Sequence, residues 1–356
     1  MPKRGKILFG VLNWGLGHAT RSIPVIQQLL EEDYEVIIAS DGAALALLQR
    51  EFPQLTFEAL PGYHIRYSRN PRFFSLKLLS QTPHILQNMR KEKKITRKLV
   101  DKHQADLIIS DNRFGFRDKR IRNIYITHQL RVLSGLTTPL TTWLHSLIYR
   151  RFNEIWVPDY AGEFNLSGKL GHLKRPGDSI KYIGPLQRMQ KREIPKKYDI
   201  VAVLSGPEPQ RTLLEKELLK KLQQLPFKTA VIQGLVNDKP VVKQQGDVDV
   251  YNYLTATGLE KLLNASELII SRSGYTSVMD LTQLQKKLLW IPTPGQKEQE
   301  YLAEYLHLKY GFNYQQQGKI SLANNIFQLS SPTAILPESF TKEKIKKLIK
   351  KNFEAI

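Results

Sequence analysis

Two small-residue turns carry the side chains of this sequence that are best suited to chemistry. The first, Asn13-Trp14-Gly15-Leu16-Gly17-His18, follows an apolar run and precedes an amphipathic stretch. Glycines at a strand-to-helix turn let the backbone approach a ligand closely, and the N–H groups at a helix start attract anions. His18 can act as a general base because an imidazole titrates near neutral pH. The alternative is a histidine that only supports the loop.

The second turn, Ser271-Arg272-Ser273-Gly274, also follows an apolar run and precedes a helical stretch. This geometry is typical of diphosphate binding. Asp280 would lie one to two turns into that helix, where a carboxylate can accept hydrogen bonds from both hydroxyls of a ribose. The polar loop Thr293–Glu300 comes after the next strand-like run, and its amide and carboxylate side chains suit a hydroxyl-rich ligand such as a sugar.

Two further polar residues come at the ends of apolar runs in the first half of the chain. Asp111 ends the run Ala105–Asp111 and His128 ends the run Asn123–His128. Carboxyl ends of parallel strands meet at the edge where ligands bind. Asp111 is therefore a second candidate base and His128 a candidate acceptor contact, although either residue can instead cap the next element.

The elements that must position these residues alternate between short aliphatic runs and longer amphipathic stretches. This alternation predicts α/β domains with parallel sheets covered on both faces. The expected strands are Lys6–Leu12, Tyr34–Ser40, Leu55–Leu60, Ala105–Asp111, Asn123–His128, Glu154–Pro158, Ile180–Gly184, Asp199–Ser205, Lys228–Gln233, Asp249–Leu254, Leu268–Ser271 and Leu288–Pro292. The expected helices are Thr20–Leu30, Ala43–Arg50, Leu76–Lys102, Leu140–Phe152, Arg211–Gln224, Leu259–Asn264, Thr276–Gln285 and Glu298–Lys309.

The pattern restarts once, which predicts two Rossmann-like, doubly wound domains with a ligand site in the cleft between them. We expect a first domain over residues 1–186, a basic linker over 187–198 and a second domain over 199–335. Residues 336–356 would form an amphipathic helix with Ile345, Leu348, Ile349 and Phe353 on one face. Packing of that helix on the protein body is favoured over a membrane-surface position.

These turns together resemble those of GT-B glycosyltransferases, in the family of the MurG-type lipid-linked N-acetylglucosaminyltransferases and the diacylglycerol glycosyltransferases. Gly15–His18 is similar to that family's N-terminal glycine loop, Ser271–Asp280 to its Ser-Arg-Ser-Gly motif, and Pro292–Glu300 to its proline-to-Gln-Gln loop. The resemblance covers both halves of the chain and is closest to a family 28-like C-terminal domain. It implies the GT-B fold and transfer of a sugar, with an acceptor-binding domain over residues 1–186 and a nucleotide-sugar-binding domain over 199–335.

The resemblance implies a role for several residues at the donor site. Asp280 would bind the ribose of a nucleotide sugar, Gln299 the sugar hydroxyls, and Ser273 and Gly274 the phosphates. Arg188 would contact the nucleotide, unless it is one more linker cation.

Two positions depart from the family pattern. Ser205 and Gly206 would still approach the diphosphate, although two prolines follow them where the family has glycine and serine. Glu300 stands where the family has a second glutamine, which leaves the identity of the sugar open.

The implied reaction is an inverting, metal-independent transfer of a hexose or N-acetylhexosamine from a nucleoside diphosphate sugar, expected to be UDP-linked. His18 or Asp111 would be the base, and Gly15, Gly17 and His128 would lie near the acceptor. No cofactor or metal is expected, because Asp247-Val248-Asp249, formally an Asp-x-Asp motif, enters a strand-like run. A lipid-linked or glycan acceptor is expected.

The formal net charge of +20 points to an anionic partner. Residues 63–122 hold 16 Lys and Arg against 5 Asp and Glu. Within this segment basic residues surround apolar ones, which suits docking on an anionic membrane, unless the apolar residues are buried in the core. The residues expected to dock are Arg69, Arg72, Phe73, Phe74 and Lys77.

Composition and alternatives set the remaining expectations. The sequence has no cysteine and no apolar stretch long enough for a signal peptide or a membrane span, which favours a cytoplasmic protein, peripheral on the inner face of the membrane if it docks there. A sugar-nucleotide epimerase with the same architecture is one alternative function. A basic nucleic-acid-binding protein is another, but it leaves the arrangement of Asp280 and Gln299 unexplained.

Overall fold

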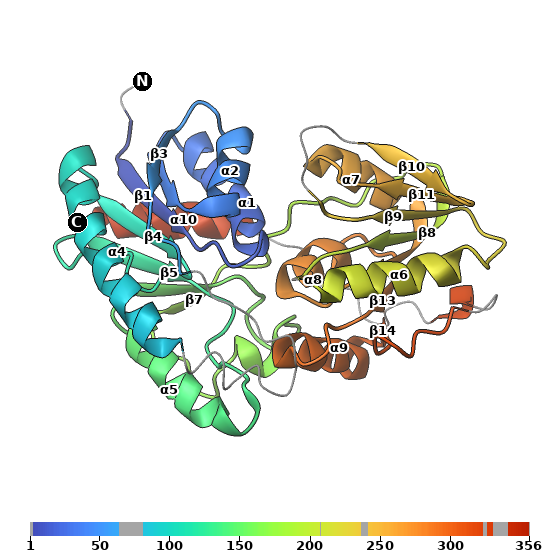
Figure 1. The fold of residues 1–356 in the computed structure, drawn as a ribbon. Helices are drawn as coiled ribbons and strands as arrows, with labels where there is room; N and C mark the ends of the chain where they lie inside the picture. Colours follow the sequence, from blue (N-terminus) through green and yellow to red (C-terminus); the bar gives the residue numbers. More distant parts are fainter. Residues whose placement is uncertain are drawn as a thin grey trace. The chain divides into compact units, whose positions relative to one another are not determined.

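The computed structural model describes residues 3–63, 81–206, 208–235, 241–322, 326–329 and 341–355. They form two compact units (Figure 1). The N-terminal unit comprises Met1–Leu186 and Glu338–Ile356, and the C-terminal unit comprises Gln187–Pro337. The C-terminal segment of the chain thus returns to the unit in which the chain begins.

A parallel seven-stranded sheet forms the centre of the N-terminal unit, with strand order β3-β2-β1-β4-β5-β6-β7. This is a doubly wound topology, in which the strand order reverses beside β1. The central strands β2, β1, β4, β5 and β6 are largely buried, as expected of a sheet covered on both faces, whereas the edge strands β3 and β7 are partly exposed. They are β1 (Lys6–Val11), β2 (Glu35–Ser40), β3 (Thr56–Ala59), β4 (Leu107–Asp111), β5 (Arg122–Ile126), β6 (Glu154–Val157) and β7 (Ile180–Tyr182).

The helices of the N-terminal unit are α1 (Gly17–Glu31), α2 (Gly42–Glu51), α4 (Thr82–His103), α5 (Thr138–Tyr149) and α10 (Thr341–Glu354). Leu99 and Val100 of α4 join the core that contains Leu8 of β1. The predicted helix Leu76–Lys102 corresponds to α4, and its first residues lie outside the described part of the chain. Helix α10 packs against α1, and the ring of Phe353 stacks on that of Tyr34, just before β2, with 4.7 Å between centroids.

A second seven-stranded sheet, of order β10-β11-β9-β8-β12-β13-β14, forms the centre of the C-terminal unit. Its strands are β8 (Tyr198–Val203), β9 (Thr229–Ile232), β10 (Val242–Gln245), β11 (Val248–Tyr251), β12 (Ser266–Ser271), β13 (Lys287–Trp290) and β14 (Asn313–Tyr314). The helices are α6 (Gln210–Leu222), α7 (Ala256–Asn264), α8 (Tyr275–Thr282) and α9 (Lys297–Tyr310).

The predicted doubly wound α/β architecture is confirmed, and the C-terminal sheet is parallel except at one edge. β10 pairs antiparallel with β11 through a hairpin at Gly246, which has φ of +62°. Every β10 residue is exposed, so the strand has no aliphatic run that would predict it. Strand β14 is also absent from the prediction, because two residues are too few to produce a pattern.

Candidate functional site

The predicted polar residues of the N-terminal unit converge at the carboxyl edge of its sheet. β4 lies between β1 and β5, and the register places Val11, Asp111 and Ile126 level with one another. Helix α1 starts beyond β1 and brings His18 to the same edge, while His128 follows two residues after β5. The three strands therefore bring together His18, Asp111 and His128, of which the first and last are 110 positions apart in the chain.

His18 and Asp111 form a hydrogen-bonded pair, with 2.9 Å between Nδ1 and Oδ1. A carboxylate only accepts hydrogen bonds, so the His18 Nδ1–H donates and Nε2 carries the lone pair. Asp111 is fully buried and accepts further bonds from the guanidinium of Arg21 and from the Ser22 hydroxyl, at 3.0 Å. This is the arrangement of a base that is oriented by a carboxylate.

Arg21 joins His128 to the same cluster. Its Nη1 lies 2.9 Å from His128 Nδ1. Because a guanidinium only donates, His128 Nδ1 accepts and its proton must reside on Nε2. The hydrogen bonds of Asp111 and Arg21 thus hold the two histidines in opposite tautomers, with His18 presenting an acceptor and His128 a donor.

The electrostatics of the cluster keep His18 neutral and Asp111 ionised. Burial lowers the pKa of His18 below its usual value of 6.5, and the charge of Arg21 lowers it further. Burial alone would raise the pKa of Asp111, but the charge and hydrogen bonds of Arg21, together with the His18 bond, hold it well below the usual range. The imidazole is therefore available to accept a proton at neutral pH.

The glycine loop takes the conformation that its sequence predicts. Gly15 has φ of +74°, in the left-handed region that glycine adopts most readily, and Gly17 is the first residue of α1. Asn13 fixes the loop: its Nδ2 donates to Asp41 Oδ2 at 3.1 Å, and its Oδ1 accepts the Ala44 N–H at 3.3 Å. The Asn13 side chain thus ties the start of the loop to Asp41 and to the first turn of α2.

The donor-side predictions lie at the carboxyl edge of the sheet in the C-terminal unit. Ser205 and Gly206 follow β8 on an exposed turn, where Gly206 has φ of +102°. Ser273 and Gly274 follow β12, and β8 and β12 are neighbours in the sheet. Ser273 is fully buried and donates its hydroxyl to the Gln299 carbonyl at 2.8 Å, while Gly274 is the N-cap of α8, which no side chain caps.

Asp280 and Arg188 contact each other directly. Oδ1 of Asp280 accepts the Arg188 N–H at 2.9 Å, and Oδ2 accepts Nε at 3.0 Å and also Nη2. Asp280 is only 2% exposed. The structure thus unites two residues that the resemblance assigns separately to the nucleotide, and a ribose bound at Asp280 would have to share the carboxylate with Arg188.

Gln299 and Glu300, predicted to contact the sugar, brace their own loop. Gln299 Oε1 accepts the Thr293 N–H at 2.9 Å and its Nε2 donates to Gln296. Glu300 Oε1 accepts the Gly295 N–H at 2.9 Å. Both side chains therefore fix the course of the loop between β13 and α9.

A group of buried polar atoms at this edge is missing from the sequence-based predictions. In the described part of the chain, eight buried side-chain polar atoms have no hydrogen-bond partner. Four of them belong to residues at the carboxyl ends of β12 and β13: Ser271 Oγ, Arg272 Nε, Trp290 Nε1 and Thr293 Oγ1. Buried polar atoms rarely lack partners, so this concentration marks a place where a ligand or water belongs.

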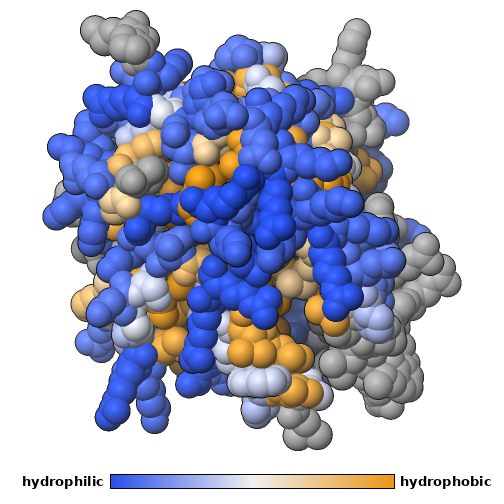
Figure 2. Space-filling view, turned by 90° about the vertical axis from the view of Figure 1, so that its left-hand side faces the viewer, coloured by the Kyte–Doolittle hydropathy of each residue, from blue (hydrophilic) through white to orange (hydrophobic). Residues whose placement is uncertain are grey.

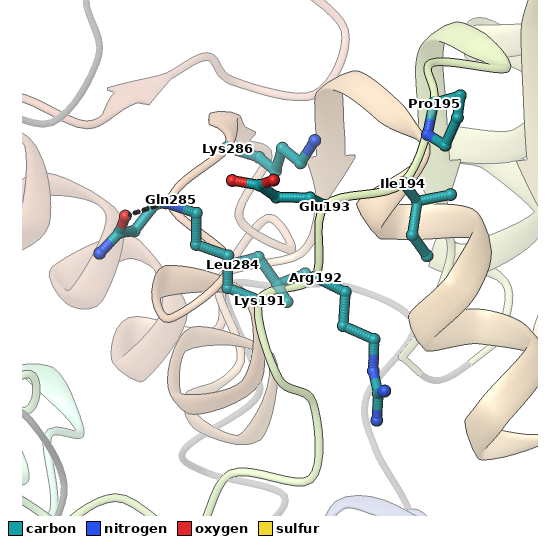
Figure 3. Close-up of a pocket in the computed structure, with 8 residues that line it drawn as sticks. All are labelled: Lys191, Arg192, Glu193, Ile194, Pro195, Leu284, Gln285 and Lys286. Atoms are coloured by element: carbon teal, nitrogen blue, oxygen red, sulfur yellow. Dashed lines mark hydrogen bonds between the residues drawn. The ribbon is translucent and has the colours of Figure 1, made fainter.

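The C-terminal unit also contains a pocket of about 570 Å³ at residues 191–195 and 284–286 (Figure 3). Lys191, Arg192 and Lys286 line it together with Glu193, and Lys191 Nζ donates to Gln285 Oε1 at 2.6 Å. Gln285 and Lys286 precede β13, at the amino end of that strand. Ligands of doubly wound sheets typically bind at the carboxyl ends, and this pocket lies at the opposite end of β13 from the predicted donor-site residues.

The residues predicted to dock on a membrane lie outside the described part of the chain: Arg69, Arg72, Phe73, Phe74 and Lys77. The structure instead shows an apolar stripe on α5 that the prediction missed. Leu140, Trp143, Leu144 and Leu147 are 50%, 57%, 39% and 38% exposed, and their spacing places them on one helix face. Figure 2 shows an apolar area at the lower end of a largely hydrophilic surface of the N-terminal unit.

None of the described helices is both long and apolar enough to cross a membrane.

Comparisons with known proteins match this chain to glycosyltransferases. A model of glycosyl transferase family 1 matches residues 5–117, and one of the glycosyltransferase family 28 C-terminal domain matches residues 202–353. An uncharacterised glycosyltransferase of Methanopyrus kandleri is 21% identical over 308 residues, covering 82% of this chain and 83% of the relative.

Two solved structures share the fold along nearly the whole chain. MurG of Acinetobacter baumannii has a TM-score of 0.61 at 15% identity, covering 98% of this chain and all of that one. The glycosyltransferase of kitacinnamycin has a TM-score of 0.65 at 13% identity, covering all of this chain and 96% of that one. These likenesses establish the fold.

Proposed function

Because this chain is a glycosyltransferase of the GT-B fold and of MurG-like type, we propose that it transfers a hexose or N-acetylhexosamine from a UDP-linked sugar. The acceptor is a hydroxyl of a lipid-linked molecule or a glycan, and the anomeric configuration is inverted. The observation that carries this proposal is the His18–Asp111 pair, which supplies an oriented, neutral base at the carboxyl edge of the N-terminal sheet.

The proposed reaction is a single displacement. The acceptor hydroxyl oxygen forms a bond to the anomeric carbon while the bond from that carbon to the diphosphate oxygen breaks. The hydroxyl proton passes to His18 Nε2, and the diphosphate leaves with the electron pair. Asp111 then stabilises the imidazolium through its hydrogen bond to Nδ1, as a buried carboxylate does in other oriented bases.

The donor site has independent support in the C-terminal unit. Ser273 and Gly274 introduce α8 at the end of β12, and the N-terminus of a helix favours a phosphate. Ser271 and Thr293 add two buried hydroxyls that lack partners among the described residues. The Arg188–Asp280 pair lies further along α8, where it would meet the nucleoside.

A thermal-shift panel of UDP, GDP and TDP sugars tests the donor assignment. We expect a UDP-sugar to raise the Tm of the wild type, and to raise that of Asp280→Asn much less. Asp199→Asn is the matched control, since Asp199 pairs with Lys196 on the same unit. If no nucleotide sugar stabilises the wild type, the transferase proposal fails, and an undiminished shift in Asp280→Asn removes Asp280 from the donor site.

We further propose that the N-terminal unit docks on an anionic membrane through α5. The apolar stripe defined by Leu140, Trp143, Leu144 and Leu147 faces solvent. Arg151 lies just beyond α5, and other basic residues lie close to it. Their proximity lowers the pKa of Lys93, chiefly through the charge of Arg117. Burial and the charges of Arg97, Arg151 and Lys119 lower it further, so these cations form a cluster.

An apolar stripe beside clustered cations is what an interfacial surface requires, and each cation near anionic lipid contributes about 1 kcal/mol. Flotation with phosphatidylcholine vesicles, with and without phosphatidylglycerol at about one lipid in three, tests whether the protein binds anionic membranes. We expect binding only to the anionic vesicles, and weaker binding by Trp143→Ser. Equal binding of anionic vesicles by the wild type and Trp143→Ser would contradict membrane docking through α5. A preference for RNA over anionic vesicles in a competition would also contradict it.

A further inference from the structure

Arg272 is the most deeply buried cation near the proposed donor site. It lies between Ser271, the last residue of β12, and Ser273, and none of its surface is exposed. Nη1 donates to the carbonyls of Ile291 and Pro292, both at 3.1 Å. Nη2 donates to the Gln210 carbonyl at 2.9 Å and to Gln317 Oε1 at 2.7 Å.

All four of these acceptors are neutral. Nε is buried and has no partner among the described residues. Among the described residues, Glu217 is the one carboxylate that acts on the pKa of Arg272, and it accepts the N–H groups of Gly318 and Ile320 rather than those of the guanidinium. The positive charge of Arg272 is therefore solvated by backbone and amide dipoles, and it has no ion-pair partner in the part of the chain that the structure describes.

The other buried arginines of the described chain are paired with carboxylates. Arg21 is paired with Asp111, Arg113 with Glu92 and Asp41, and Arg211 with Glu208 and Glu215. Such pairing is the rule, because an isolated charge is costly to bury. Burial lowers the pKa of Arg272 to about 10, so the group still carries its charge at neutral pH.

The position of Arg272 indicates what could balance this charge. Its acceptors tie together the end of β13 and the start of α6, and its neighbours Ser273 and Gly274 begin α8. These are the segments in which the donor's diphosphate is expected. The unpartnered hydroxyls of Ser271 and Thr293 belong to the same strand ends.

We propose that Arg272 is an electrostatic positioning residue whose missing counter-charge is the diphosphate of the donor. This inference rests on the proposed function. The buried guanidinium acts through its field and through the loops it holds, since its Nη atoms are already engaged. The bound diphosphate, carrying more charge than a monophosphate, gains more from this field.

Calorimetric titration of the full chain with uridine, UMP and UDP, and in parallel with thymidine, TMP and TDP, tests the proposal. In Arg272→Gln we expect the affinity gain from UMP to UDP to fall about tenfold, with uridine binding unchanged. In Arg272→Lys, which keeps the charge, we expect most of the gain to remain. The exposed Lys261→Gln is the control for net charge on the same unit.

The salt dependence of the wild type provides a second test that needs no variant. Salt screens a buried charge only weakly. We therefore expect the ratio of UDP affinity to UMP affinity to change less than about twofold between about 50 mM and about 500 mM NaCl. A steep fall would assign the preference to surface cations and overturn the proposal. So would an unchanged ratio in Arg272→Gln, or an equal loss for uridine and UDP.

The titrations distinguish failure of the proposed donor site from failure of the role of Arg272. Wild-type protein that binds none of the six compounds overturns the proposed donor site, and the role of Arg272 with it. Wild-type protein that binds UDP, combined with an unchanged UMP-to-UDP gain in Arg272→Gln, overturns the role of Arg272 alone.

Discussion

At the scale of single residues, the His18–Asp111 pair makes the sharpest prediction. Asp111→Asn removes the carboxylate that orients and stabilises His18, and His18→Ala removes the proposed base. We expect kcat to fall about 100-fold or more in His18→Ala, the usual range for a lost general base, with little change in donor KM. The measurement is steady-state kinetics with the nucleotide sugar that stabilises the protein.

The control for this prediction is Ser22→Ala, which removes one hydrogen bond to Asp111 but keeps His18 and Arg21. Its kcat should fall by less than about tenfold. An active His18→Ala enzyme would contradict the role of His18 as the base.

The pH dependence of kcat follows from the environment of His18. Burial and Arg21 lower its pKa below 6.5, and only the neutral imidazole accepts a proton. We therefore expect activity to hold down to pH 6.5 and to fall only at lower pH. Arg21→Gln removes the second cause of the lowered pKa and should shift that fall to higher pH.

A pH–rate profile of both proteins measures this shift. Long-range ¹H–¹⁵N NMR of the histidine rings provides a readout beyond activity, because it reports which nitrogen of His18 and His128 bears the proton. Wild-type spectra that show the same tautomer for both histidines would contradict the assignment.

The sequence predicts these residues unevenly, and for physical reasons. A polar residue at the end of an aliphatic run, such as Asp111, signals its place at the sheet edge, so His18, Asp111 and His128 could be chosen without a structure. Arg21 and Arg272 could not, because their partners are 90 and 62 positions away or are backbone carbonyls. Burial of a charge leaves no local signal.

At the scale of elements, α5 faces solvent on one side, and on the other side His145 contacts the rings of Phe114 and Tyr125. His145 lies on the buried side, 3.3 Å from the Tyr125 hydroxyl, and its Nδ1 has no partner among the described residues. Burial, followed by the nearby His128, lowers the pKa of His145 to about 4. The folded protein therefore holds His145 neutral in a range where the unfolded chain takes up a proton.

The sign of the resulting pH dependence is determined by this lowered pKa. Above pH 6.5 His145 is neutral in both states and does not affect stability. As pH falls from 6.5 to about 4, the unfolded chain takes up a proton that the folded protein does not, which lowers the free energy of unfolding. The loss is at most about 3 kcal/mol. We expect His145→Phe to flatten the decline in free energy of unfolding between these pH values, measured by urea denaturation. An unchanged slope would show that His145 titrates normally.

Elements differ in how well the sequence predicts them. The central strands were found because each is a continuous buried aliphatic run, whereas exposed β10 and the two-residue β14 lack such a pattern. The exposed stripe of α5 was missed for the opposite reason: its spacing of apolar residues is also that of a helix packed in the core.

At the scale of the whole molecule, the chain leaves the N-terminal unit after Leu186 and returns to it through α10. The C-terminal unit is thus one continuous segment, while the N-terminal unit is completed by the last residues of the chain. A substitution that weakens the packing of α10 should therefore destabilise the N-terminal unit, although the residues that precede α10 in the chain belong to the C-terminal unit.

Asn352 provides the test, since it is fully buried on α10. Its Oδ1 accepts from Arg122 Nε at 2.9 Å, and its Nδ2 donates to Glu154 Oε2 at 3.0 Å. Asn352→Ala leaves these two charged groups without their amide partner, which costs about 1–3 kcal/mol. We expect the Tm of the N-terminal unit to fall by several degrees, at about 2–4 °C per kcal/mol for a unit of this size.

Calorimetry with UDP present separates the two units, because a ligand raises the Tm only of the unit that binds it. In Asn352→Ala we expect the UDP-responsive transition to keep its wild-type Tm while the other transition moves down. Lys351→Ala, which alters an exposed neighbour on the same helix, should move neither. A downward shift of the UDP-responsive transition in Asn352→Ala would mean that α10 stabilises the donor-binding unit instead, and that the two units do not unfold independently.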